Sequence, residues 1–163
     1  MVERDTFVTV ADGDQLNENY FNGIEPAMFK HAGSDQTAAT VTGTTAETEI
    51  GEVSIAANLV TTGILVIATG TSNLIASASD GTATIKLYGG TSATATSNTE
   101  FKSTVRTNAT TAAGSANTID LDWTMVFYIS TLTWTSTNYI NITATLSSVS
   151  QSSTCESIEI IYL

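Results

Sequence analysis

The sequence has few of the residues on which disulfide bonds, zinc sites and histidine chemistry depend. Its 163 residues include one cysteine, Cys155, one histidine, His31, and one proline, Pro26. A single cysteine excludes an intrachain disulfide, and with it a small secreted domain stapled by such bonds. Zinc needs three or four Cys or His ligands, and this chain has two such residues, far apart in sequence. The sequence therefore predicts no zinc site within one chain.

Basic residues are scarce as well. Five Lys and Arg stand against 16 Asp and Glu, which gives a formal net charge of −11. An acidic surface repels a phosphate backbone, and the five basic residues form no run that would attract an anionic membrane. We therefore expect neither a nucleic-acid partner nor a membrane partner.

Long hydrophobic runs are also missing. No charged residue lies between Glu52 and Asp80, a length that could suggest a membrane span. Glycine, asparagine and many hydroxyl residues interrupt this stretch, however, and its only dense apolar run is Ile64 to Ala68. We interpret it as two buried strands and a turn. The N-terminal MVERDTF carries charges where a signal peptide needs apolar residues, so we expect synthesis in a cytoplasm.

Threonine and serine are abundant, at roughly three residues in ten, far above ordinary usage. β-branched threonine favours strands that have one solvent-exposed face. Short strand patterns recur between turn residues, and their number, eight, is that of a jelly roll. The sequence thus predicts an all-β, jelly-roll-like antiparallel β-sandwich. The expected strands are 38–44, 48–55, 63–69, 83–88, 100–107, 118–130, 139–147 and 156–163.

Several expected strands show which residues face the core, because alternate side chains point to opposite faces. The inward sets are Ala83, Ile85 and Leu87; Phe101, Ser103 and Val105; Trp123, Met125, Phe127 and Ile129; and Ile140, Ile142, Ala144 and Leu146. Val126 and Tyr128 make the other face of their strand apolar too, as do Ile161 and Leu163 at the C-terminus. We expect a second cover over these residues, such as another subunit.

The first 34 residues differ from the rest and are interpreted as an N-terminal anchoring arm and linker, with residues 35–163 as the sandwich domain. In the stretch DTFVTVADGDQLNENYFN we expect a strand or extended arm at the start, a turn at Asp12-Gly13-Asp14 and a short helical turn over 17–22. A piece this short cannot fold alone. The expected anchoring residues are its apolar ones: Phe7, Val8, Val10, Leu16, Tyr20 and Phe21.

Catalytic patterns are missing from the sequence. His31 lies in the linker, and there is no nucleophile turn of the G-x-S-x-G type and no phosphate-binding glycine loop. Two acidic pairs, Glu47 with Glu49 and Asp120 with Asp122, have the spacing of one strand face, which is usually solvated. A cation site and glycoside hydrolysis stay open as alternatives for such pairs. We predict no catalytic residues, no metal and no cofactor.

Trp134 is the one possible ligand-facing residue, because an aromatic face can stack on a sugar. Trp123 is expected in the core instead. The segments 108–117 and 130–138 are the loops that would present a glycan site beside Trp134. The sequons at Asn108 and Asn141 are interpreted as chance products of an Asn- and Thr-rich chain.

The stretches TFVTVADGDQLNENYFNGI, EIGEVSIAANLVTTGILVIATGT, GTATIKLYGG, WTMVFYI and ESIEIIYL, in this order, resemble virion structural proteins of tailed phages and related viruses. The resemblance implies an N-terminal anchor, of the pattern V-x-D-G-D-x-L-N-x-x-Y-F-N, before a jelly roll that usually forms trimers. Ala56 departs from the pattern, which often has proline there. The expectation is a non-enzymatic capsid decoration protein, bound to a major capsid protein or a neighbouring virion protein. The alternatives are a receptor-binding tail-fibre or spike tip and, third, a glycoside-acting enzyme.

Overall fold

The structure, a computed structural model, describes residues 30–35, 39–110 and 115–163. The helical turn and the six anchoring residues predicted in the arm lie outside this part of the chain. The described residues form nine strands and one 3-10 turn, and no helix among them is long and apolar enough to cross a membrane. The elements are β1 (Lys30–Asp35), β2 (Ala39–Thr42), β3 (Thr48–Ile55), β4 (Ile64–Ala76), β5 (Gly81–Gly90), η2 (Ala95–Ser97), β6 (Thr99–Asn108), β7 (Asn117–Ile129), β8 (Asn138–Leu146) and β9 (Ser152–Tyr162).

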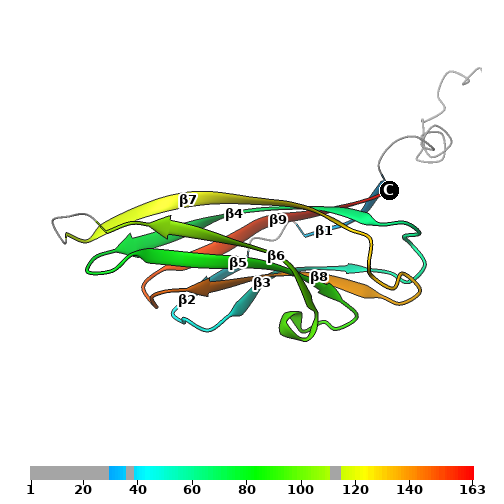
Figure 1. Cartoon of the computed structure of the whole chain (residues 1–163), viewed down its shortest axis with the longest axis horizontal. Helices are drawn as coiled ribbons and strands as arrows, with labels where there is room; N and C mark the ends of the chain where they lie inside the picture. Colours follow the sequence, from blue (N-terminus) through cyan, green and yellow to red (C-terminus); the bar gives the residue numbers. More distant parts are fainter. Residues whose placement is uncertain (1–29, 36–38, 111–114) are drawn as a thin grey trace, which may run out of the picture.

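The strands form two antiparallel sheets that pack face to face (Figure 1). Sheet A has the order β1-β9-β4-β7, with β2 pairing along the same edge of β9 as β1, and sheet B has the order β3-β8-β5-β6. Across both sheets, β5 pairs with β6, β4 with β7, β3 with β8 and β2 with β9, as if one long hairpin had been rolled up. This is a jelly roll, and it confirms the fold class expected from the sequence.

The core lies between the two sheets and is made of the apolar side chains that alternate along the strands. In β4 every second residue from Ile64 to Ala76 is buried, as period-2 alternation requires. The inward faces predicted for β5 and β8 are confirmed, and so are Trp123, Met125 and Ile129 of β7. β9 lies in the middle of sheet A, which explains why the end of the chain is so apolar.

β4 is longer than expected because Gly70 continues the strand rather than ending it. In the register of sheet A, Gly70 lies opposite Trp123. A Cβ at residue 70 would collide with the Trp123 ring and with the carbonyl oxygen of Thr154. The glycine therefore marks a close approach between a large core side chain and the neighbouring backbone. The sequence predicted a strand end at Thr69, because a glycine in the hydropathy pattern looks like a break. The contact with Trp123 depends on the pairing of two strands, which that pattern does not show.

The face predicted for β6 is wrong beyond its first residues. Leu87 pairs with Lys102 but Tyr88 pairs with Glu100, so Phe101 is an extra residue in a β-bulge. The bulge shifts the alternation by one position. As a result Val105, expected in the core, is 54% exposed, and Arg106, expected outside, is half-buried.

Residues 30–34, assigned above to the arm and linker, pair with β9 as part of β1. His31, expected in an exposed linker, lies opposite Ile161 in this ladder. The uncharged stretch between Glu52 and Asp80 supplies the end of β3 and all of the long strand β4.

Candidate functional site

Trp134 lies at the rim of the sandwich, between β7 and β8, and packs against the core instead of standing free. It lines a hollow of about 370 Å³ together with Asn58, Val60, Thr61 and Thr135. The indole Nε1 is buried and has no hydrogen-bond partner within the described structure. The ring is therefore partly a structural residue and only partly available to a ligand.

The other sequence features have structural roles. Trp123 is fully buried in the core, as expected. The two sequon asparagines are buried, and their side-chain amides are occupied: Asn108 donates to the carbonyls of Leu74 and Asn117, and Asn141 donates to Glu49 and Glu52. Neither side chain is accessible to a glycosylating enzyme in the folded state.

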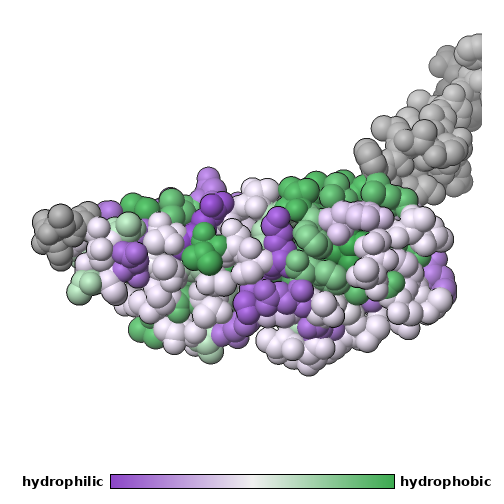
Figure 2. Space-filling view, in the orientation of Figure 1, coloured by the Kyte–Doolittle hydropathy of each residue, from purple (hydrophilic) through white to green (hydrophobic). Residues whose placement is uncertain are grey.

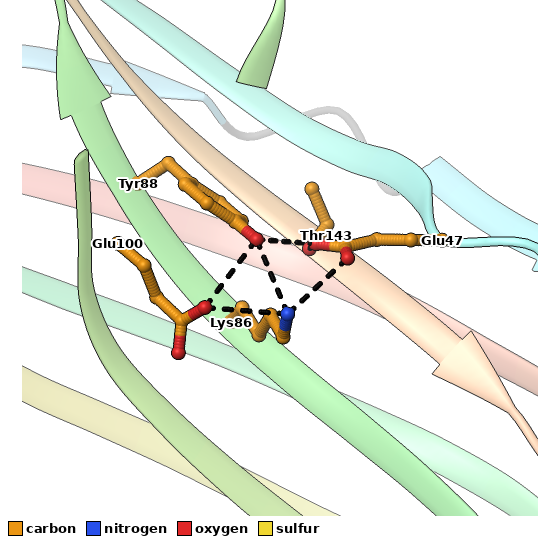
Figure 3. Close-up of polar contacts among 5 residues, drawn as sticks. All are labelled: Glu47, Lys86, Tyr88, Glu100 and Thr143. Carbon is orange, nitrogen blue, oxygen red and sulfur yellow. Dashed lines mark hydrogen bonds and ion pairs between the residues drawn. The ribbon is translucent and has the colours of Figure 1, made fainter. Parts of the chain in front are cut away.

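The outer face of sheet B carries a network of polar side chains from β5, β6 and β8 and from the residue just before β3 (Figure 3). Lys86 of β5 makes ion pairs with Glu47, at 3.3 Å, and with Glu100, at 3.2 Å. Its ammonium group also lies 3.3 Å from the Tyr88 hydroxyl, which donates to Glu47 at 2.8 Å. Thr143 of β8 donates to the same Glu47 oxygen at 2.7 Å. Glu47, just before β3, is thus held by three partners.

These contacts fix the charge of the network. Burial raises the pKa of Glu47, but hydrogen bonds from Thr143, Tyr88 and Lys86, together with the Lys86 charge, outweigh it, so this pKa lies below its usual value. The hydrogen bond with Tyr88 and the contacts with both carboxylates hold the pKa of Lys86 above its usual value. Glu47 and Lys86 are therefore both charged at neutral pH.

A second polar group continues this face towards the segment that contains η2. The fully buried Asn141 donates to Glu49 at 3.1 Å and to Glu52 at 3.0 Å, and it accepts from Asn98 at 3.0 Å. Burial, followed by the charge of Glu52, raises the pKa of Glu49. These hydrogen bonds hold residues 91–98 against the outer face of β8. Polar side chains on this outer face are buried because that segment covers them.

The two networks separate the acidic pair that the sequence places together. Glu47 belongs to the Lys86 cluster, whereas Glu49 belongs to the Asn141 cluster. In the described part of the chain, no three His, Cys, Asp or Glu side chains lie close enough to hold a metal ion. The polar groups of this face form hydrogen bonds and ion pairs mainly with one another. Their structural role is to hold loops against the sheet.

The outer face of sheet A is different, because one end of it carries apolar side chains that nothing in the described chain covers. We call this the outer patch, and it consists of Leu65, Ile67, Val126, Tyr128 and Ile161. Val126 is 50% exposed and Tyr128 is 48% exposed, while the other three are half-buried. Figure 2 shows hydrophobic residues gathered over this end of the molecule, near the end of β7 and the C-terminus.

The register of the sheet makes the outer patch contiguous. Leu65 lies between Tyr128 and Ile161 in one row across three strands, and Ile67 lies between Val126 and the exposed Glu159 in the next row. Side chains on one face in such positions touch their neighbours. Val126, Tyr128 and Ile161 were expected to need a second cover, and they are confirmed on the outer face. Leu65 and Ile67 were missed, although an unbroken apolar run in a strand signals that both faces are apolar.

The other end of the same face is polar and acidic. Asn73 donates to Asp120 at 2.7 Å, and Thr71 donates to Glu156 at 2.8 Å and lies 3.2 Å from Asp122. Asp120 and Asp122 are exposed, as the sequence predicts for a solvated strand face. The outer patch is thus a bounded apolar area and not a general property of the sheet.

We find no match between this chain and any protein-family model, any curated protein or any solved structure.

Proposed function

We propose that this chain is a non-enzymatic structural protein of a virus particle, a capsid decoration or surface protein that assembles as a trimer. The part of the arm that precedes β1, with Phe7, Val8, Val10, Leu16, Tyr20 and Phe21, attaches it to the capsid or to a neighbouring subunit. These six residues lie outside the described structure, and their role comes from the sequence.

The observation that carries this proposal is the outer patch on sheet A. A jelly roll alone is no argument for a function, because viral capsid proteins, lectins and cupins all use it. Apolar side chains that stay exposed side by side after folding lose their contact with water only when another surface covers them, and this favours docking in an assembly. The polar face of sheet B adds support, since its side chains are engaged mainly with one another.

The test is the composition of purified particles together with the mass of the isolated protein. We expect the chain among the proteins of particles banded on a density gradient, and a trimer by light scattering. Hundreds of copies per particle favour a shell protein, and a handful favours a tail fibre or spike. A chain that is monomeric at all concentrations and missing from particles contradicts the proposal.

The role of the arm is tested separately by deleting residues 1–24. The truncated chain should keep the circular dichroism spectrum of a folded β-protein, because the strands that the structure describes lie at Lys30 and beyond. It should lose its attachment to particles. Decoration at full occupancy by the truncated chain contradicts anchoring by the arm.

A second candidate function, a receptor-binding tip that binds host glycans, is favoured by the hollow beside Trp134. Its lining combines an indole with the hydroxyl and amide groups of Thr61, Thr135 and Asn58, which is the mixture that sugars require. A glycan array compares the wild type with Trp134→Ala and with Trp134→Phe, which keeps a ring. Binding that survives Trp134→Ala unchanged removes this site.

A further inference from the structure

We propose that the outer patch of one copy binds residues 5–22 of a neighbouring copy, so that the N-terminal arms link the subunits of the assembly. This inference rests on the proposed function and names the contact by which copies hold one another. It predicts which segment covers the outer patch. Within the described outer face of sheet A, the outer patch is the only part that is mainly apolar.

The size of the outer patch fits a peptide segment better than a whole subunit. Five neighbouring residues on one face of a sheet cover roughly 150 Å², given the spacing of strands and of alternate residues. A stable contact between two globular surfaces needs about 800 Å² on each side. Two sandwiches stacked on this face would therefore have to cover the acidic end of sheet A as well. A segment with a few apolar side chains fills the outer patch without touching Asp120 or Asp122.

The composition of residues 5–22 matches the chemistry of the outer patch. The segment has six large apolar side chains, three of them aromatic, among acidic and amide residues. Such side chains lose contact with water only when the segment docks on an apolar surface. If TFVTV is extended, as its sequence predicts, Val8 and Val10 share one side and Phe7 lies on the other; the spacing of Leu16, Tyr20 and Phe21 predicts one helical face.

The position of β1 favours a neighbouring copy over the same chain. Lys30 is opposite Tyr162 and His31 is opposite Ile161, so the arm joins the body at the end of the sheet that holds the outer patch. From Lys30, β1 runs inward along the sheet. The preceding residues must reverse direction to cover the patch of their own chain, but not to reach another copy. Residues 23–29 span up to about 25 Å, enough to bridge adjacent subunits.

Photocrosslinking in the full-length chain tests the occupant. Benzoylphenylalanine replaces Tyr128 in the outer patch or, as a matched control, Tyr139, which lies half-buried on the outer face of sheet B. Equal amounts of ordinary and ¹⁵N-labelled protein are mixed, irradiated and analysed by mass spectrometry. We expect cross-links from position 128 to residues 1–29 of the other isotopic form, several-fold above those from position 139.

Cross-links from position 128 to residues 39–163 of another copy, cross-links within one chain only, or no cross-links in a chain that still forms oligomers each overturn the inference. A light-scattering measurement on the same samples separates this failure from that of the proposed function. Oligomers with cross-links elsewhere leave the proposed assembly in place, whereas a chain that is monomeric throughout contradicts the assembly itself.

A pair of matched valine variants provides a second readout. Val126→Ser changes a half-exposed residue of the outer patch, and Val105→Ser changes an equally exposed residue on β6. Both should fold, since neither valine is in the core. We expect Val126→Ser to weaken subunit association about tenfold or more, because it removes apolar area from the contact. Val105→Ser should stay within about twofold of wild type. Equal effects of the two variants overturn the inference.

Discussion

Replacing Lys86 with methionine tests whether the polar network on sheet B stabilises the fold electrostatically. The substitution keeps most of the side-chain volume but removes the ammonium group that contacts Glu47, Glu100 and Tyr88. Half-exposed ion pairs contribute about 0.2–1 kcal/mol each, and Lys86 makes two of them besides its contact with Tyr88. We therefore expect Lys86→Met to lower the free energy of unfolding by about 1–2 kcal/mol at pH 7.

This loss should depend on pH in a defined direction. The pKa of Glu47 is lowered in the folded state, because the hydrogen bonds and the Lys86 charge outweigh burial. A carboxyl with a lowered pKa contributes stability that is complete above its unfolded value, about 4.3, and is lost as the pH falls through the folded value. Once Glu47 is protonated, Lys86 has lost the less exposed of its two charged partners. The cost of Lys86→Met should then shrink to about 0.5 kcal/mol or less as the pH falls through the folded pKa of Glu47.

Urea unfolding of the wild type, Lys86→Met and Lys102→Met at pH 7 and at a series of lower pH values measures these differences. Lys102→Met is the matched control, since it removes the same charge. Lys102 is exposed, makes no ion pair within the described residues and lies 5.9 Å from the centre of the Phe127 ring. Its cost should be about 0.5 kcal/mol and should change little with pH. If the cost of Lys86→Met does not fall anywhere in this pH series, or is no more at pH 7 than that of Lys102→Met, the electrostatic reasoning is wrong.

Two further predictions concern stability, and urea unfolding measures both. Gly70→Ala should cost about 3 kcal/mol or prevent folding, because its Cβ would meet the Trp123 ring. The control, Gly43→Ala, is at φ +73° in open space and should cost about 1 kcal/mol. Equal costs for Gly70→Ala and Gly43→Ala would argue against the close approach at Gly70. Trp134→Ala should cost about 2 kcal/mol and Trp134→Phe less, since the indole packs against the core. A cost near zero for Trp134→Ala would mean that this ring serves only a ligand.

The sequence was sufficient to predict the fold class, because alternation along a strand records which face is buried. β3 begins and ends where the sequence predicts, and the inward faces of β5 and β8 are correct. The alternation failed at Phe101, where a bulge shifts every later residue of β6 to the opposite face. It also failed at Gly70, which looked like a strand end but lies under Trp123. Both failures come from contacts between strands, which a pattern within one strand does not contain.

The candidate surfaces were only partly predictable, for a related reason. Val126 and Tyr128 were predicted as outward apolar residues because their strand is apolar on both faces. Leu65 and Ile67 join them only through the register of β4 with β7. The network around Lys86 brings together residues up to 96 positions apart in the sequence, as between Glu47 and Thr143. No spacing rule connects such residues, because the pairing of β3, β8 and β5 sets their distances.

The two outer faces of the sandwich differ in what docking would change, and this difference indicates how an assembly would be built. On sheet B the charged and amide groups already form hydrogen bonds and ion pairs with one another. Covering them would therefore add little favourable free energy and would remove their remaining hydration, which is unfavourable. On sheet A, covering five half-exposed apolar side chains contributes on the order of 5 kcal/mol before the entropy of association is subtracted. One such contact is weak by itself.

In a closed ring, each copy binds one neighbour and is bound by the other. Breaking a single contact then releases no subunit, so the contacts reinforce one another. We therefore expect a sharp, concentration-dependent transition between monomer and closed ring, with little of the intermediate dimer.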